Sequence, residues 1–79
     1  MEIVLKNTNN LQEKIVQHVE EAAGRDDDFL ILYAADSIIK EVTLELRGMN
    51  LGRVDYNKND LFVTGLGVYI SVKSIDKYV

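Results

Sequence analysis

The sequence predicts an α+β two-layer sandwich with the element order β-α-β-α-β-β, and three observations support it. A short aliphatic segment at residues 2–6 precedes an amphipathic helical pattern over residues 11–23. The apolar run FLILYA at residues 29–34 has the length of a strand. A second helical pattern then precedes an alternating segment at residues 68–75. The chain of 79 residues is expected to form one domain, 1–79.

The first segment, EIVLK, is rich in β-branched and aliphatic residues and ends at the turn-forming sequence NTNN, so it predicts a buried strand. The helix that follows has a capping-box pattern, in which Asn10 caps the first turn and Glu13 reaches back. Gly24 is expected to cap the other end. The apolar face of this predicted helix consists of Leu11, Ile15, Val19, Ala22 and Ala23.

The run FLILYA follows the charged sequence RDDD at residues 25–28. It is almost uninterrupted, which is typical of a strand buried on both faces. With the first strand and helix it predicts a βαβ unit, in which the strands are parallel and the crossover is right-handed.

The stretch YAADSIIKEV at residues 33–42 is compatible with a continued strand or with a helix that begins at Asp36 or Ser37. Alternation at residues 42–46 supports a strand. The helical pattern is longer and has capping residues at both ends, so we favour the helix. This places Lys40 in the first turn, pointing away from the apolar face. That face would contain Ile38, Ile39, Val42, Leu46 and Met49.

The C-terminal part is expected to hold a hairpin of two strands. A short segment at residues 51–56 and a turn-like NKND precede residues 61–67, and residues 68–75 alternate as a half-buried antiparallel strand does. Gly65 and Gly67 would let the hairpin loop bend.

The composition excludes several classes of protein. Nine Lys and Arg residues against 13 Asp and Glu residues give a net charge of −4. This charge repels polyphosphate, so it excludes a protein that binds nucleic acid by unspecific charge attraction. Without cysteine the chain has neither a disulfide nor a thiolate metal site, and we expect a reducing, cytoplasmic location. No apolar run is long enough to span a bilayer, so no membrane partner is expected. A core this small would gain from a partner subunit.

No residue pattern predicts catalysis. His18 and Glu21 have a spacing that would let them share a metal ion or a proton, but a histidine on a polar helix surface rarely does so. The acidic run at residues 26–28 lacks the ligand spacing of a calcium loop, and Gly65-Leu66-Gly67 lacks the context of a phosphate-binding loop. We therefore expect no enzyme activity, cofactor, metal ion or small-molecule substrate.

Binding is the better-supported prediction. Six cationic side chains lie on elements that the fold could bring to one side, and four tyrosines could stack on bases. Strand tyrosines more often pack at the edge of a core. The cations are Lys6, Lys14, Lys40, Arg53, Lys58 and Lys73, and the tyrosines are Tyr33, Tyr56, Tyr69 and Tyr78.

Nearly the whole chain resembles the Alba family of archaeal nucleic-acid-binding proteins. The likeness lies in EIVLKNTNNLQEKIVQHV, in FLILYAADSIIKEVTLEL and in the terminal VYISVKSI. The same element order occurs in the C-terminal domain of translation initiation factor three. The resemblance implies an Alba-like fold and a chromatin- or RNA-associated homodimer, or a heterodimer with a paralogue, that binds DNA or RNA. The nucleic-acid-binding residues that it implies are Lys6, Asn7, Thr8, Lys40, Arg53 and Lys58.

This chain departs from the family at several phosphate-binding positions. Asn7 and Thr8 stand where basic residues are expected, and Ala35-Asp36 replaces a Gly-Arg pair, although the helix lysine is kept as Lys40. The hairpin carries only Lys58, where the family tends to have several arginines. We therefore expect weak nucleic-acid binding. The alternative is an Alba-like dimerisation module that pairs with a basic paralogue or another protein and itself binds little nucleic acid.

Overall fold

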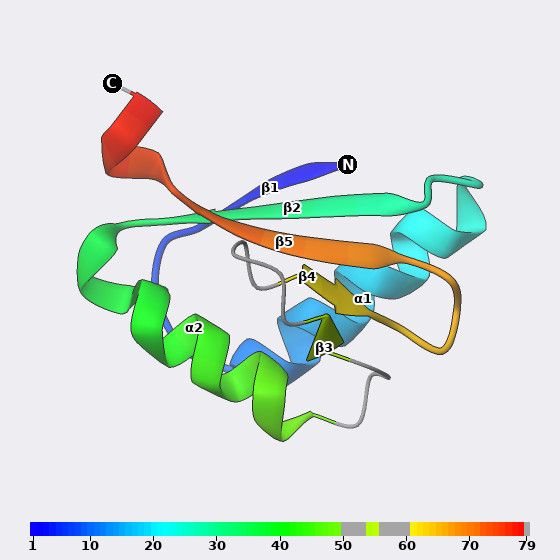
Figure 1. The fold of residues 1–79 in the computed structure, drawn as a ribbon, viewed down its shortest axis with the longest axis horizontal. Helices are drawn as coiled ribbons and strands as arrows, with labels where there is room; N and C mark the ends of the chain where they lie inside the picture. The colour runs from blue at the N-terminus through cyan, green and yellow to red at the C-terminus, as the bar shows by residue number, and fades with distance from the viewer. Residues whose placement is uncertain (50–53, 56–60, 79) are drawn as a thin grey trace.

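Five strands form one mixed sheet, with two α-helices packed against it, in the computed structural model, which describes residues 1–49, 54–55 and 61–78 (Figure 1). The strands are β1 (Glu2–Leu5), β2 (Phe29–Ala34), β3 (Val54–Asp55), β4 (Leu61–Val63) and β5 (Tyr69–Ser74). The helices are α1 (Leu11–Gly24) and α2 (Asp36–Gly48), and a short 3₁₀ helix, η1 (Ile75–Tyr78), follows β5.

The strand order is β1-β2-β5-β4-β3. β2 runs parallel to both β1 and β5, whereas β4 is antiparallel to its neighbours β5 and β3. The predicted parallel βαβ unit and the second helix are therefore confirmed. The predicted order is one strand short, because residues 51–67 contain two strands of only two and three residues. Strands this short show no periodicity in the sequence.

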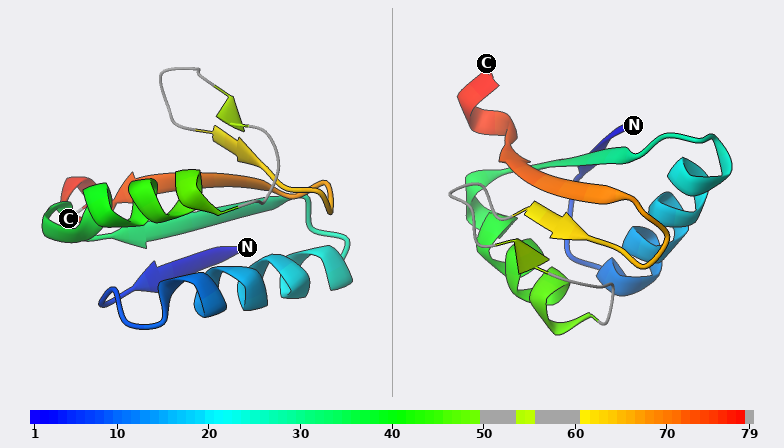
Figure 2. Two further views of the ribbon diagram at one scale, coloured as in Figure 1. Left: turned by 90° about the horizontal axis from the view of Figure 1, so that it is seen from below. Right: turned by 45° about the vertical axis from the view of Figure 1, so that its right-hand side comes forward.

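Both helices cover the same face of the sheet. The connections β1-α1-β2 and β2-α2-β3 step across the sheet in the same direction, so right-handed crossovers place their helices on one side. The helices lie below β1, β2 and β5 in Figure 1, and the left panel of Figure 2 shows the molecule from below. Leu32 is 0% exposed but Phe29 is 44% exposed. The prediction that this strand is buried on both faces is therefore wrong.

The core lies between the sheet and the helices, as the helical periodicity predicted. The buried residues of α1 are Leu11, Ile15, Val19 and Ala22, and those of α2 are Val42 and Leu46. Ile38, Ile39 and Met49 pack against this core, and Lys40 is exposed on the opposite side of α2. No helix in the described part of the chain is long and apolar enough to cross a membrane.

The N-termini of both helices differ from the predicted caps. Asn10 has left-handed backbone angles (φ 52°, ψ 42°) and makes no side-chain cap, so the predicted capping box with Glu13 is wrong. The N-cap of α2 is Ala35, so the prediction that Asp36 or Ser37 caps this helix is wrong. The Asp36 carboxylate instead accepts a hydrogen bond from the Ser74 hydroxyl, a partner 38 residues away that local sequence patterns do not reveal.

The C-terminus of α1 is a Schellman motif rather than a Gly24 cap. Asp26 adopts φ 55°, and the backbone N–H of Asp27 donates to the Ala22 carbonyl at 2.9 Å. Aspartate is one of the few residues other than glycine that visits this conformation. The motif fixes the path of the acidic turn into β2.

The predicted hairpin loop is confirmed between β4 and β5. The Thr64 N–H donates to the Val68 carbonyl at 2.9 Å, and the Thr64 hydroxyl oxygen accepts from the Val68 N–H at 3.0 Å. Gly67 has φ 79°, a conformation that side chains rarely adopt.

Candidate interaction surfaces

The three parallel strands all end at one edge of the sheet, which we call the carboxyl edge. The loop of residues 6–10 follows β1 there, α2 begins after β2, and η1 follows β5 (Figure 1). Of the predicted nucleic-acid-binding residues, the fold brings the loop residues Lys6, Asn7 and Thr8 to the same edge as the helix that carries Lys40. The other two, Arg53 and Lys58, lie outside the described residues.

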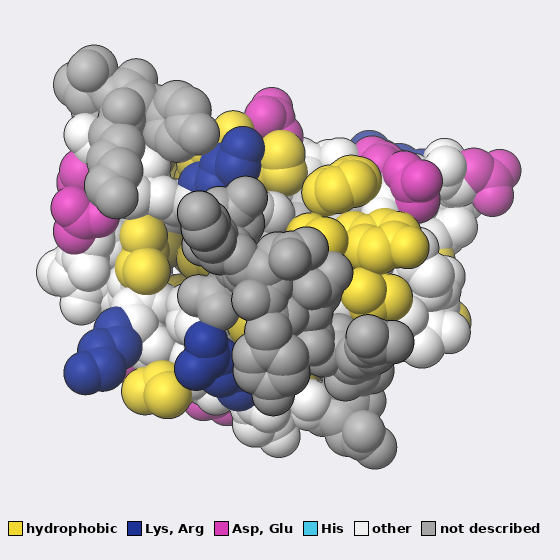
Figure 3. Space-filling view, in the orientation of Figure 1, with side chains coloured by type: hydrophobic (Ala, Val, Ile, Leu, Met, Phe, Trp, Pro, Cys, Tyr) yellow, Lys and Arg dark blue, Asp and Glu magenta, His cyan; other side chains and the backbone are white. Residues whose placement is uncertain are grey.

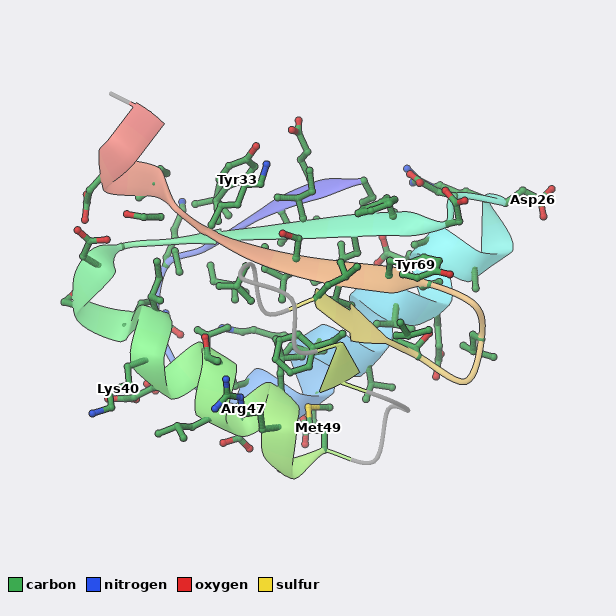
Figure 4. The ribbon with its side chains drawn as sticks, in the orientation of Figure 1. Asp26, Tyr33, Lys40, Arg47, Met49 and Tyr69 are labelled. Carbon is green, nitrogen blue, oxygen red and sulfur yellow. The ribbon has the colours of Figure 1, made fainter. Side chains whose placement is uncertain are left out.

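The predicted binding side chains at the carboxyl edge differ in how accessible they are to a ligand. Lys6 and Lys40 are exposed, and Lys40 points away from the sheet (Figure 4). Asn7 is engaged within the protein, because its side-chain oxygen accepts from the Lys14 ammonium at 3.0 Å and from the Asn9 N–H at 3.0 Å. Thr8 is half-buried.

Two carboxylates occupy the N-terminus of α2. The Asp36 N–H donates to the Asp76 carboxylate at 2.8 Å, and the Ser74 hydroxyl donates to the Asp36 carboxylate. The Asp76 N–H in turn donates to the Ser74 hydroxyl oxygen at 3.2 Å. A helix N-terminus attracts anions such as phosphate, but here the chain's own carboxylate takes that position. A nucleic-acid phosphate would therefore meet negative charge at this end of α2.

The second surface is the side of the sheet opposite the helices, which we call the open face. Because strand side chains alternate, the register places on it Glu2, Val4, Phe29, Ile31, Tyr33, Leu61, Val63, Tyr69, Ser71 and Lys73. Val4, Phe29 and Tyr69 are 51%, 44% and 37% exposed. Figure 3 shows hydrophobic side chains gathered around the amino end of β5, where Figure 4 labels Tyr69. Contiguous exposed apolar residues, unlike isolated ones, mark interaction sites.

An aromatic pair lies at one end of the open face. Phe29 and Tyr69 are partners in the β2–β5 register, and their rings stack with centroids 5.7 Å apart and planes at 23°. Tyr33 lies on the same face further along β2, and its hydroxyl donates to Glu2 at 3.0 Å. Tyr33 and Tyr69 were among the predicted stacking residues, but Phe29 was not, although alternation within FLILYA places it on the same face as Tyr33.

The two ends of the open face carry different charges. The amino ends of β2 and β5 lie beside the acidic turn, in which Asp26 and Asp28 are exposed. Figure 3 shows acidic side chains beside the hydrophobic patch at this end. Towards the carboxyl ends of the strands lie Lys73 on β5 and Lys6 directly after β1. The open face therefore has an acidic end and an end of mixed charge, because Asp36 and Asp76 lie at the same edge as Lys6 and Lys73.

Asp27 in the acidic turn is expected to make stability depend on pH. The Met1 amino group donates to its carboxylate at 2.6 Å and the Phe29 N–H donates at 3.1 Å, and both interactions lower the pKa of Asp27 below its usual 3.8. A lowered folded-state pKa stabilises the protein above 3.8 and this stabilisation is lost as the pH falls through the lowered value. Denaturant unfolding from about pH 7 to about pH 2 should show that Asp27→Asn lowers the free energy of unfolding at neutral pH and that this loss shrinks in acid. A loss that stays the same at every pH would contradict this assignment.

The geometry gives little support to a catalytic site, a metal site or a ligand pocket among the described residues. His18 Nδ1 lies 3.9 Å from Glu21 Oε1, too far for a hydrogen bond, and has no other hydrogen-bond partner. Among the described residues, no group of three His, Cys, Asp or Glu side chains could hold a metal ion. A hollow of about 190 Å³ beside residues 26–28 and 66–68 is smaller than the roughly 300 Å³ of typical ligand pockets.

No protein-family model, curated protein or solved structure matches this chain. The likeness to the Alba family therefore stays a prediction from the sequence.

Proposed function

We propose that this chain is an Alba-like interaction module that pairs with another protein through its open face and binds nucleic acid only weakly. The observation that carries the proposal is the exposed, stacked aromatic pair of Phe29 and Tyr69 on a face of the sheet where Val4 is also exposed. In a domain this small such a surface is costly to leave in water, and a partner that covers it would add to a limited core.

The charges support a protein partner over a polyphosphate. The net charge is −4, and Asp36 and Asp76 occupy the helix end at which a phosphate would be held most readily. A basic paralogue is the partner favoured by this charge, because opposite net charges speed association and suppress pairing with like-charged proteins.

Mixing the chain with a basic member of the Alba family tests the proposal by native mass spectrometry. We expect a one-to-one complex that Phe29→Ser weakens about tenfold or more, because the substitution removes half of the stacked aromatic pair. Leu44→Ser is the matched control, since Leu44 is equally apolar and 56% exposed but lies on α2. Absence of a complex, or equal weakening by both variants, would count against the open face.

Nucleic-acid binding is the second candidate function. It is favoured by the arrangement of Lys6 and Lys40 at the carboxyl edge, on elements that meet only in the folded chain. These two cations supply few phosphate contacts, so the binding would be weak and its salt dependence would be shallow. Charge reversal at Asp36 tests this function.

A further inference from the structure

We infer that the amino end of the open face is a docking surface for an arginine-bearing segment of a partner protein, whose guanidinium group stacks on the rings of Phe29 and Tyr69. The inference rests on the proposed function, since it assumes that the open face binds protein. It adds the chemistry of the segment that is bound and the place on the sheet where it is held.

The ring pair offers a surface for a third planar group. Phe29 and Tyr69 belong to the central strands β2 and β5, yet both side chains keep much of their surface exposed. Their planes differ by only 23°, so the rings lie almost parallel to each other. Stacked rings of this kind attract a cation to a ring face, because the face carries the negative part of the ring quadrupole.

The acidic turn lies against this pair. Asp28 directly precedes Phe29, and its carbonyl accepts from the Tyr69 N–H at 2.8 Å. Asp26 and Asp28 are both exposed, and neither carboxylate makes an ion pair with another described residue. A cation over the rings would therefore also gain from two carboxylates that have no counter-ion.

The other charges at this end do not reverse its sign. Asp27 is held by the Met1 amino group, Glu2 adds a carboxylate on β1, and Arg25 adds the guanidinium of the turn. Together with the two exposed aspartates, carboxylates outnumber cations by four to two. Lys73 lies four residues beyond the ring pair along β5, about 13 Å away, which exceeds the roughly 8 Å over which physiological salt screens exposed charges.

An apolar contact lies beside the acidic turn. Leu66, in the β4–β5 turn, is 60% exposed, and it lines the hollow of about 190 Å³ together with residues 26–28. Asp28 and Val68 also line this hollow, and each directly precedes one ring of the stacked pair. A hollow this small suits one side chain better than a free small molecule. The segment that fits this end therefore has an aliphatic side chain close to its arginine.

Arginine fits the ring pair better than lysine does. A guanidinium group is planar, stacks on aromatic faces and is weakly hydrated, whereas an ammonium group is a compact and strongly hydrated charge. Arginine is also enriched in protein interfaces, as tyrosine is.

A single strand of nucleic acid is the competing occupant, because its bases could stack on the same rings. Its phosphates would then lie beside the exposed carboxylates of Asp26 and Asp28. Repulsion between these like charges disfavours nucleic acid at this end of the sheet.

Nuclear magnetic resonance titration of the full, ¹⁵N-labelled chain tests the site. The probe is a short capped peptide in which arginine alternates with leucine, and it should shift the amide signals of Phe29, Leu66 and Tyr69. A peptide with glutamine in place of arginine should bind about tenfold more weakly, and a lysine peptide should lie between the two. Equal affinities for the arginine and glutamine peptides would overturn the inference. So would a single-stranded oligonucleotide that shifts these signals at lower concentration than the arginine peptide does.

Two variants separate the contribution of the rings from that of the charge. Tyr69→Leu keeps an apolar side chain but removes a ring, and it should raise the dissociation constant of the arginine peptide about fivefold. Asp28→Asn should raise it about two- to fivefold. Glu20→Gln is the matched control, because it removes the same charge from the exposed surface of α1 and should have no effect. Equal effects of Asp28→Asn and Glu20→Gln would overturn the inference.

Failure of this inference is distinguishable from failure of the proposed function. The chain can form a complex with a basic family member that Phe29→Ser weakens and still show no preference for the arginine peptide over the glutamine peptide. That result would exclude the arginine site and leave the proposed function intact.

Discussion

Replacement of Leu32 by alanine is expected to destabilise the domain by about 2–5 kcal/mol, the range found for buried leucine truncations. Leu32 is 0% exposed in the middle of β2, where its register partners are Ile3 on β1 and Val72 on β5. The side chain thus lies where the central strand meets the helices, and its removal would leave a cavity. Total stabilities of small domains are about 5–15 kcal/mol, so this one change would remove a large part.

Urea unfolding followed by circular dichroism measures this loss. The transition midpoint should fall while the slope stays close to that of the unaltered chain, as expected when stability alone changes. Leu44→Ala is the matched control, because Leu44 is 56% exposed and its truncation should change stability by less than about 0.5 kcal/mol. A loss below about 1 kcal/mol for Leu32→Ala would show that β2 is not central to the core.

Substitution of Asp36 by arginine is expected to strengthen nucleic-acid binding on the order of tenfold at low salt and to steepen its salt dependence by about one unit. The change replaces a carboxylate at the start of α2 with a cation, at the edge that also carries Lys6 and Lys40. It ends the hydrogen bond from Ser74 to Asp36 and gives Asp76 a cationic neighbour. Fluorescence anisotropy with duplex DNA and structured RNA measures both quantities.

Asp28→Arg separates a local contact from the effect of total charge. It makes the same change in net charge at the opposite end of β2, beside the aromatic pair. Only Asp36→Arg should steepen the salt dependence if nucleic acid is bound at the carboxyl edge. Equal gains from both variants would indicate unspecific attraction, and no gain from either would exclude this edge as a phosphate-binding surface.

Asp76→Asn tests the role of the carboxylate at the end of α2. Asparagine can still accept the hydrogen bond from the Asp36 N–H but carries no charge. A smaller increase in affinity than with Asp36→Arg is therefore expected, and far-ultraviolet circular dichroism should confirm that both variants keep their helices.

The sequence by itself determined the first four elements. The two helices were predicted from apolar residues at helical spacing, and β2 was predicted from an apolar run with the bounds that the structure has. These patterns are local, since each depends on residues a few positions apart. The β4–β5 turn was also predicted from the sequence, because the turn needs a residue with positive φ and Gly67 supplies it.

Only the tertiary structure decided which face of the sheet stays open and which carboxylate lies at the start of α2. The direction of the crossovers puts both helices on one side, so the apolar residues of β2 that look alike in sequence separate into a buried and an exposed set. The contact between Asp36 and Asp76 joins residues 40 positions apart and exists because β5 pairs with β2. Such features depend on strand pairing across long sequence separations, about which local residue patterns carry no information.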